Sequence, residues 1–568
     1  MKKKSIRFLF TLILVFSINN GFSQYLSWAY GTGGLGSNSG KCISLFNNND
    51  IYMTGYFNGT IDIDPSLGVC NLTSNYYASS FLVKYNTTGS FNWAFMLGAY
   101  DNTSKVYNTS VVNDTEGNVY IAGYFAGTVD FDPGSGSQIF TSNGNFDYYI
   151  AKYDSAGNYI WAFSIGGLST DMIHSMCIDN SNNLYVFGIT SENTDIDPDT
   201  SVFINYDTGI SPYYQEFIAK YNENGNFIWG KNFPGRFYND ASSIKVDKRN
   251  NIVITGQLLQ NGDFDPGPDT CLLSSYGSYD IFISKFDSSG NFIFAENMGS
   301  SGYDAGLSMA FDEANNIYII GLFNDTVDFD PDTSSFFLSS CGDNDIFIAK
   351  YDSIGRFLNA FSIGGAGLDI GYAITLDPLE NIYVTGCFHD TTDFDPSMNN
   401  YELIALAGAD IFLAKYNNNN QLKWAIGVGS QSGFYIGDIS HSLLCDLSDN
   451  VYISGYYSSY ADFDPSYDTL FLETNGCSGL FIAKYSNEPT YNNVVKENND
   501  ITIYPNPTTG KITIKAEDMQ NVEIIDLQGK QIYTGKENQI DLSNQPKGIY
   551  IIKVITDKQT ITRKLIKQ

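Results

Sequence analysis

The tetrapeptide Asp328-Phe329-Asp330-Pro331 decides the fold of this chain, because it is one copy of a motif that recurs along most of the sequence. The motif has the form Asp, then an aromatic residue or Ile, then Asp and Pro, and successive copies begin 68, 65, 68, 65, 65 and 69 residues apart. Its carboxylates are Asp62 and Asp64, Asp130 and Asp132, Asp195 and Asp197, Asp263 and Asp265, Asp328 and Asp330, Asp393 and Asp395, and Asp462 and Asp464.

A second motif keeps step with the first. It has the form Phe-Ile-Ala-Lys-Tyr, as in residues 347–351, and its lysines are Lys84, Lys152, Lys220, Lys285, Lys350, Lys415 and Lys484. Two motifs in register over seven copies indicate an internal repeat and predict a repeat architecture for most of the 568 residues.

The fifth copy shows what one repeat contains. Turn residues separate four short segments of strand-like composition, at 306–312, 316–323, 345–352 and 356–364. Four antiparallel strands that are apolar on both faces must be covered by the next copy, and a radial arrangement covers every face. The sequence therefore predicts an all-β fold, a seven-bladed β-propeller of four-stranded blades.

The ends of the repeat region predict that the ring closes. The fourth strand of most copies contains an aromatic-Ala pair, as in Trp93-Ala94, but the last copy runs from Phe481–Tyr485 directly into Ser-Asn-Glu-Pro. Ser27-Trp28-Ala29-Tyr30 precedes the first copy and has the missing pattern. We expect this N-terminal strand to complete the last blade.

These residues resemble a known family. The order Ser-Met-x-x-Asp, Asn-Asn-Ile-Tyr-Ile-x-Gly, Asp-Ile-Phe-Ile-Ala-Lys-Tyr-Asp and Gly-Asn-Phe-Ile-Trp-Ala is similar to the bacterial β-propeller repeat family and, more distantly, to NHL-type propellers. The resemblance covers residues 25–487. It implies the fold and not the ligand, because propellers host many unrelated functions.

The N-terminus has the pattern of a secretory signal peptide, residues 1–24. Lys2, Lys3, Lys4 and Arg7 precede an apolar run over residues 8–16, and small residues follow at 21–23. No later stretch reaches the roughly 18 apolar residues that a transmembrane helix needs. We expect a mature chain without a transmembrane segment.

Composition changes after a polar linker at residues 488–500. Residues 501–568 contain short alternating stretches that predict a small Ig-like β-sandwich. Four motifs, at 503–510, 526–530, 547–550 and 564–567, resemble the C-terminal sorting domain of the type IX secretion system. The resemblance implies a Gram-negative source, handling by the type IX secretion machinery through residues 501–568, and a cell-surface or extracellular location after export through the periplasm and outer membrane.

The charge of the middle of the chain excludes one class of partner. Residues 25–500 hold 17 Lys or Arg against 55 Asp or Glu, a net charge of −38. Such a surface repels phosphate backbones, so we expect no nucleic-acid partner. The eight cysteines show no regular pairing pattern, and we expect most of them to be small buried apolar groups.

The fourteen motif carboxylates have three interpretations. Two carboxylates on one side of an extended strand could contribute oxygens to calcium, although calcium takes six to eight ligands. Alternatively, the first Asp makes a turn-type hydrogen bond to the backbone while Pro ends the strand. A third possibility is an ion pair with the lysine of the second motif, for example Asp328 or Asp330 with Lys350. We expect the insertions that carry the motif to form an acidic rim around the channel mouth.

No catalytic motif stands out. His174 and His441 fall in blades three and seven, nearly opposite each other, and His389 is expected in a loop. We predict a non-enzymatic recognition or adhesion module without a cofactor, calcium excepted, that binds an extracellular glycan or protein through exposed Tyr and Phe. The alternatives are an extracellular carbohydrate-active enzyme on a propeller scaffold and a structural surface-coat component.

Overall fold

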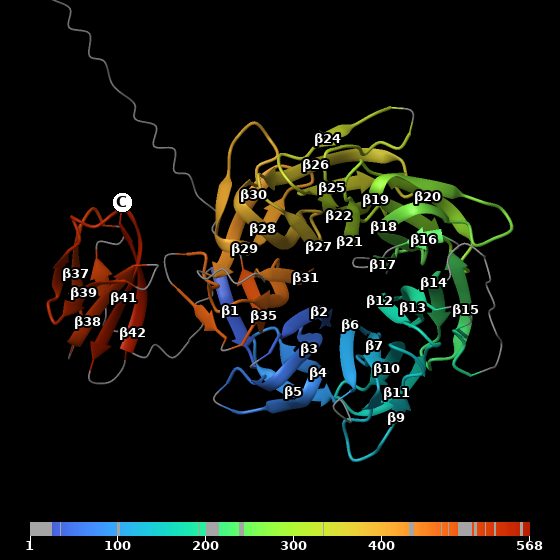
Figure 1. Ribbon diagram of the computed structural model, residues 1–568, viewed down its shortest axis with the longest axis horizontal. Helices are drawn as coiled ribbons and strands as arrows, with labels where there is room; N and C mark the ends of the chain where they lie inside the picture. The colour runs from blue at the N-terminus through green and yellow to red at the C-terminus, as the bar shows by residue number, and fades with distance from the viewer. Residues whose placement is uncertain are drawn as a thin grey trace, which may run out of the picture.

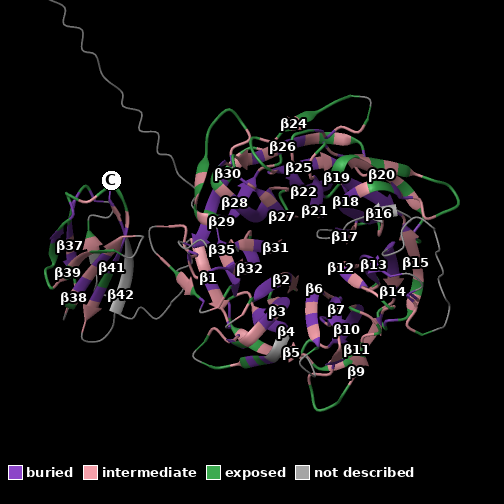
Figure 2. Ribbon diagram, viewed as in Figure 1, coloured by how far each residue is buried: buried purple, intermediate pink, exposed green. Residues whose placement is uncertain are grey.

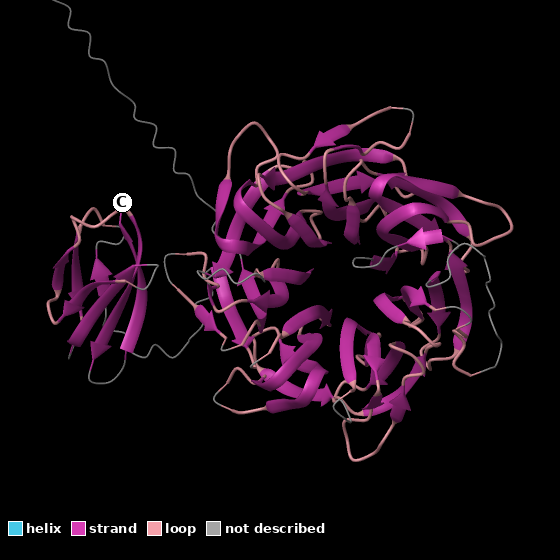
Figure 3. Ribbon diagram, viewed as in Figure 1, coloured by secondary structure: helices cyan, strands magenta, loops and turns pink. Residues whose placement is uncertain are grey.

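The computed structural model describes residues 25–486 and 502–567, with gaps at 35, 67, 99–102, 192–193, 200–214, 234, 238–242, 333, 431–436, 467–468, 475, 505–507, 517–518, 527–529 and 557–559. Regular structure within these residues consists of strands alone (Figure 3), which confirms the all-β prediction. No described segment forms a helix that could cross a membrane. The expected signal peptide, residues 1–24, and linker, residues 488–500, lie outside the described residues.

Each repeat folds into a four-stranded antiparallel unit whose first strand is innermost in the ring and whose fourth strand is outermost (Figure 1). The first three repeats contribute β2 (Ser39–Phe46), β3 (Asp50–Asp62), β4 (Asn71–Asn86) and β5 (Phe91–Leu97); β6 (Lys105–Asn113), β7 (Val119–Ala126), β10 (Asp147–Tyr153) and β11 (Tyr159–Ile165); and β12 (Met172–Ile178), β13 (Leu184–Thr190), β14 (Gln215–Tyr221) and β15 (Phe227–Phe233). The next three contribute β17 (Ser243–Val246), β18 (Ile252–Asp263), β19 (Leu272–Phe286) and β20 (Phe292–Met298); β21 (Ala305–Phe311), β22 (Ile317–Phe323), β25 (Asp345–Tyr351) and β26 (Phe357–Gly365); and β27 (Ile370–Leu376), β28 (Ile382–Asp393), β29 (Glu402–Tyr416) and β30 (Leu422–Ser430). In the fifth repeat every predicted strand boundary is confirmed to within one residue.

The N-terminal strand β1 (Tyr25–Thr32) completes the last repeat. That repeat supplies β31 (Ile439–Cys445), β32 (Val451–Tyr457) and β35 (Gly479–Ser486), and β1 pairs antiparallel with β35. Trp28 lies opposite Lys484, and Ala29 lies opposite Ala483. The predicted closure is therefore confirmed, and ladder hydrogen bonds join the two ends of the repeat region (Figure 1).

The hydrophobic core lies between neighbouring repeats. Tyr52 and Leu82 of the first repeat share one buried cluster with Val106 and Ile121 of the second. Buried residues are dense along the second and third strands around the ring (Figure 2). Each unit thus hides its apolar faces against its two neighbours, as the pattern of the sequence requires.

An insertion that carries the Asp-x-Asp-Pro motif separates the second and third strands of each repeat. In the first, fourth and sixth repeats β3 and β4, β18 and β19, and β28 and β29 simply extend into a hairpin. In the second, fifth and last repeats the insertion forms the short pairs β8 (Thr128–Asp130) with β9 (Ile139–Thr141), β23 (Thr326–Asp328) with β24 (Phe337–Ser339), and β33 (Tyr460–Asp462) with β34 (Phe471–Glu473). We call the segments that carry the motif the insertion hairpins. A separate strand, β16 (Gly235–Phe237), pairs with β18.

The repeated lysine stabilises the turn between the first two strands of its own repeat. Lys350 Nζ lies 3.1 Å from Asp312 Oδ2 and 4.6 Å from the centre of the Tyr318 ring. The proposed pairing of Lys350 with Asp328 or Asp330 is wrong, because Lys350 lies opposite Tyr318 at the start of β22, whereas those acids follow the end of that strand. The same device occurs in Lys152–Asp114 (3.3 Å), Lys220–Asp179 (3.7 Å), Lys285–Asp247 (2.8 Å) and Lys415–Asp377 (3.3 Å).

The ammonium group also reaches the next repeat. Lys285 donates to the carbonyl of Ser353 at 3.0 Å, and Lys484 of the last repeat donates to the carbonyl of Thr87 in the first at 3.1 Å. These two lysines therefore link two repeats as well as two strands.

Buried carboxylates face one another where the third strand of one repeat meets the first strand of the next. These acid pairs are Asp147 with Asp171, Asp280 with Asp304, Asp345 with Asp369, and Asp410 with Asp438. Oδ1 of the first member of each pair has no hydrogen-bond partner among the described residues. Burial, aided by the facing acid, raises the pKa of Asp345 and of Asp410 to about 7. Near neutral pH these two carboxyl groups are therefore only partly ionised.

Residues 502–567 form two further sheets around a core of their own. One contains β36 (Thr502–Tyr504), β37 (Lys511–Lys515) and β40 (Gln539–Asp541), and the other contains β38 (Met519–Asp526), β39 (Gln531–Gly535), β41 (Gly548–Thr556) and β42 (Thr560–Lys567). Ile512 and Ile514 from the first sheet and Val522, Ile524 and Ile552 from the second lie in one buried cluster.

The closure predicts a large effect of truncating Trp28. Its side chain is 8% exposed, packs 6.1 Å from the Tyr452 ring and donates to the carbonyl of Thr87 at 3.4 Å. Trp28→Ala should lower the free energy of unfolding by about 3 kcal/mol, measured by urea titration with circular dichroism. Ile160→Ala, on the outermost strand of the second repeat, should change it by less than about 0.5 kcal/mol. Equal effects of the two variants would contradict the closure.

The acid pairs predict that stability falls as pH rises. A carboxyl group whose pKa is higher in the folded than in the unfolded chain stabilises the folded chain, and this contribution is complete below the unfolded-state pKa. It is lost as the pH rises through the folded-state pKa, and it amounts to about 1.4 kcal/mol for each unit by which the two pKa values differ. The thermal midpoint should therefore fall between pH of about 4 and about 7. Asp410→Asn should make this fall shallower, whereas the exposed Asp269→Asn should leave it unchanged. Identical slopes for both variants would refute the assignment.

Candidate functional site

The insertion hairpins lie at the outer edge of the ring. The hairpin of the sixth repeat pairs with the outermost strand of the fifth, Asp393 opposite Gly364, and that of the last repeat pairs with the sixth, Asp462 opposite Gly429. β9 and β24 lie on the periphery in Figure 1. The expectation that the insertions surround the channel mouth is therefore wrong.

A left-handed residue precedes the motif in every repeat in which this position is described. The residue three positions before the motif has positive φ, and the ladder register shifts at Gln260 and Asp390 and directly before Gly59. The equivalent residues elsewhere are Gly127, Asp325 and Ser459, with φ of 78°, 56° and 53°. Because this bend follows the second strand, the chain leaves the inner part of the repeat before the motif is reached.

The first Asp of the motif accepts backbone hydrogen bonds across the hairpin. Oδ1 of Asp328 accepts from the amide of Asp330 at 3.2 Å and from that of Phe336 at 2.7 Å. The same contact across the hairpin, from Oδ1 to a backbone amide, occurs in Asp62–Cys70 (2.9 Å), Asp130–Gln138 (2.7 Å), Asp263–Cys271 (2.9 Å), Asp393–Tyr401 (2.9 Å) and Asp462–Leu470 (3.0 Å). Asp195 Oδ1 accepts from the amide of Asp197 (3.0 Å). The turn-type hydrogen bond that we considered is present.

The second Asp of the motif caps the turn that follows. Asp64 Oδ1 accepts from the amide of Ser66 at 2.9 Å, and Asp132, Asp197, Asp265, Asp330, Asp395 and Asp464 accept from the residue two positions later at 2.8 to 3.1 Å. In the described part of the chain, no three His, Cys, Asp or Glu side chains gather as a metal site would need. Calcium at these carboxylates stays a prediction.

The tyrosine of the second motif anchors the hairpin, a role that the sequence analysis missed. Its hydroxyl donates to the carbonyl of the residue between the two acids, in Tyr85–Ile63 (2.8 Å), Tyr153–Phe131 (2.9 Å), Tyr221–Ile196 (2.8 Å), Tyr351–Phe329 (3.0 Å), Tyr416–Phe394 (2.8 Å) and Tyr485–Phe463 (3.0 Å). Burial raises the pKa of these phenols, so they remain neutral donors. The fourth repeat has Phe286 at this position. The regular recurrence of the tyrosine in the second motif was the feature of the sequence from which this role could have been predicted.

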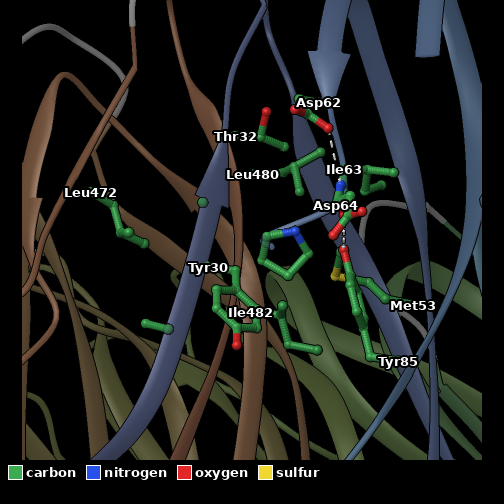
Figure 4. A pocket seen from close by; sticks show the side chains of 13 residues that line it. Tyr30, Thr32, Met53, Asp62, Ile63, Asp64, Tyr85, Leu472, Leu480 and Ile482 are labelled. Carbon is green, nitrogen blue, oxygen red and sulfur yellow. Dashed lines mark hydrogen bonds between the residues drawn. The ribbon is translucent and has the colours of Figure 1, made fainter. Parts of the chain in front are cut away.

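The junction of the first and last repeats shows the anchor at close range. In Figure 4 the Tyr85 hydroxyl points to the backbone between Asp62 and Asp64, and Tyr30 of β1 lies across the cavity. This cavity has a volume of about 320 Å³, and Leu472 and Leu480 of the last repeat also line it. The closing strand thus forms one wall of a small surface cavity at the outer edge.

The insertion hairpins also expose apolar side chains. Leu272 is 66% exposed, Tyr276 70%, Phe337 63% and Ile404 68%. We define the rim patch as the exposed large apolar residues of the hairpins: Val69, Ile139, Leu272, Tyr276, Phe336, Phe337, Met398, Tyr401, Ile404, Leu406 and Leu470. A repeated set of this kind marks a contact surface more strongly than scattered single residues do.

The three histidines occupy other positions. His174 on β12 and His441 on β31 both line the central cavity, and His389 lies within β28 instead of the expected loop, because the ladder continues through the bend of the hairpin. The amide of His389 donates to Asp369 Oδ1 at 3.0 Å. The strand pairing and this hydrogen bond indicate a structural role for His389.

The cysteines differ from expectation. All eight are free, but only Cys387 is fully buried, five are partly buried, and Cys341 and Cys477 are exposed. The prediction of mostly buried thiols is wrong, because several lie on channel-facing strands or in the hairpins, where one side of the residue meets solvent.

Comparison with known proteins gives distant relatives for the repeats. The uncharacterized WD repeat-containing protein L264 of Acanthamoeba polyphaga mimivirus is 24% identical over 536 residues, which cover 77% of this chain and 38% of the relative. The regulatory protein FlaEY of Caulobacter vibrioides is 26% identical over 207 residues, which cover 35% of this chain and 21% of the relative. The chain thus spans well under half the length of both relatives.

Solved structures show only weak overall similarity. The Neurospora crassa Pan2 WD40 domain has a TM-score of 0.29 at 8% identity, covering 66% of this chain and 88% of that one. A europium-containing methanol dehydrogenase has 0.31 at 10%, covering 81% and 93%. NanB plus Optactamide has 0.30 at 11%, covering 81% and 68%.

The C-terminal part of the chain matches a described family. Residues 502–568 match the family described as the secretion system C-terminal sorting domain. The alternating strands and four motifs of this segment predicted such a domain from sequence. Residues 502–568 are therefore a type IX sorting domain, which indicates export to the cell surface or the extracellular space.

Proposed function

We propose that this protein is an exported, non-enzymatic recognition or adhesion module of a Gram-negative cell surface. Its parts are a signal peptide at residues 1–24, a seven-bladed β-propeller at 25–487, a linker at 488–500 and an Ig-like sorting domain at 501–568. The rim patch is the observation that carries the recognition function, and the sorting domain match supports the location.

The rim patch has the chemistry of a protein-binding surface. Its residues protrude from separate hairpins that are held by the motif carboxylates and, outside the fourth repeat, by the buried tyrosines. Aromatic and aliphatic side chains on rigid supports lose little conformational entropy when a partner covers them. A partner with a broad apolar surface could contact several hairpins at once, and this multivalency raises its affinity.

Export predicts a simple truncation result. In a host that has a type IX secretion system, a chain that lacks residues 502–568 should remain in the periplasm, while the full chain reaches the surface or the medium, as detected by immunoblotting of cell fractions. Replacing Lys511 with Ala, a side chain that is largely exposed, is the matched control and should leave export unchanged. Surface display of the truncated chain would contradict the assignment.

The rim patch predicts a localised loss of binding. The labelled full chain is applied to arrays of extracellular proteins and of glycans, with calcium and with EDTA. The triple variant Tyr276→Ser, Phe337→Ser and Ile404→Ser should weaken protein binding by at least about tenfold, because it removes three exposed apolar contacts. Loss of binding in EDTA would support calcium at the motif carboxylates.

A matched pair of substitutions controls for general surface effects. Leu379 and Leu447 are each 78% exposed but lie outside the insertion hairpins. The double variant Leu379→Ser and Leu447→Ser should bind as the unaltered chain does. Equal loss in both variants, or binding to glycans alone, would overturn protein recognition by the rim patch, and turnover of a polysaccharide would overturn the non-enzymatic function.

A further inference from the structure

The innermost strands of all the repeats enclose a central cavity. Residues of β2, β6, β12, β17, β21, β27 and β31 line it, and its volume is about 650 Å³. This is within the range of about 300 to 1,000 Å³ that is usual for small-molecule sites. The wall is also rigid, because side chains of one strand bond to the backbone of the next, as when the amide of Ile43 donates to Ser442 Oγ at 3.2 Å.

The charge of this cavity is opposite to that of the rest of the ring. None of the described residues that line it is Asp or Glu, although the whole chain has a net charge of −31. Two lysines, Lys41 on β2 and Lys245 on β17, do line it. Neither has an acidic partner among the ion pairs of the described residues, whereas six of the seven repeated lysines of the third strands do. The cavity therefore holds positive charge that no nearby carboxylate neutralises.

Lys41 is positioned by aromatic and imidazole groups. Its Nζ lies 3.1 Å from His441 Nε2, and the His441 ring packs 5.4 Å from that of Tyr372 and 5.5 Å from that of Tyr456. Burial and the charge of Lys41 lower the pKa of His441, which makes the imidazole a neutral acceptor for the ammonium group. Burial also lowers the pKa of Lys41 itself, to about 8. An anion beside Lys41 would offset this loss of hydration.

Lys245 lines the same central cavity from the fourth repeat. Its charge partly offsets the rise that burial causes in the pKa of the Cys42 and Cys177 thiols, which lie on the first and third repeats. His174, also on the cavity wall, has a buried Nε2 without a hydrogen-bond partner among the described residues. Two uncompensated ammonium groups and an unused imidazole nitrogen thus converge on one cavity.

We propose that the central cavity binds a small organic dianion that bears carboxylate or phosphate groups. Lys41 and Lys245 supply the opposing charges, and His174 supplies a hydrogen bond through Nε2. The rest of the wall supplies the Asn113 amide, the His441 imidazole and hydroxyl, thiol and apolar groups, none of them anionic, so a second anionic group on the ligand is needed to satisfy both lysines. This inference is independent of the rim patch, because the inner and outermost strands lie on opposite sides of each repeat.

Titration of the full chain with succinate, inorganic phosphate and neutral succinamide tests the proposal. Heat of binding and the thermal midpoint are measured at constant ionic strength, with sodium chloride as the reference. Succinate or phosphate should raise the midpoint in a concentration-dependent way, while succinamide should not, because ligands that bind only the folded state stabilise it. A response to one anion alone identifies whether the site prefers carboxylate or phosphate.

Two variants separate the site from general salt effects. Lys41→Met and Lys245→Met retain the length of the side chain and remove its charge, and each should weaken anion binding by at least about tenfold. Without an anion their midpoints should equal or exceed that of the unaltered chain, because an unpaired buried charge has been removed. Lys423→Met, on the exposed face of β30, is the matched control and should retain the response.

The outcomes distinguish this inference from the proposed function. The triple variant of the rim patch should bind the anion normally, and the two lysine variants should bind rim partners normally. The inference is overturned if neither anion shifts the midpoint beyond sodium chloride, or if the lysine variants respond as the unaltered chain does. Either result leaves recognition by the rim patch unaffected.

Discussion

Every feature of the repeat region depends on the face-to-face packing of sheets that cannot shield their own apolar sides. Clusters such as the one that joins Tyr52 and Leu82 to Val106 and Ile121 exist only between repeats, so no repeat has a complete core alone. Such a chain has two exposed ends unless it closes on itself. The pairing of β1 with β35 removes both ends at once, because the N-terminal strand β1 becomes the outermost strand of the last repeat.

The third strand of each repeat performs two separate tasks with adjacent residues. Lys350 points to the turn at Asp312, and Tyr351, whose side chain lies on the other face, holds the hairpin through the carbonyl of Phe329. Because these contacts attach the hairpin at its base, its tip can vary from repeat to repeat without loss of the core. The apolar side chains of the rim patch occur in this variable part.

Electrostatics divides the ring into three zones. The outer hairpins carry carboxylates whose oxygens are used by backbone amides, the interfaces between repeats bury acid pairs such as Asp410 with Asp438, and the central cavity contains lysines and no acid among its described residues. Burial has opposite consequences in the last two zones, since it favours a proton on Asp410 and disfavours one on Lys41. Hence the acid pairs lose charge by holding a proton, whereas Lys41, with a pKa of about 8, is still mostly charged at neutral pH and would be stabilised by the anion that we propose.

The sequence by itself determined the repeat, its four strands and the strand that closes the ring, because these follow from local patterns and from a copy that lacks its fourth segment. It also identified the sorting domain, through motifs that are contiguous in the chain. Only the tertiary structure decided that Lys350 meets Asp312 instead of Asp328, that the hairpins occupy the outer edge, and that Lys41 and Lys245 share a cavity. The reason is physical: a left-handed bend of one residue redirects a hairpin, and a ring brings together strands that are remote in sequence, so these contacts depend on geometry that no local pattern encodes.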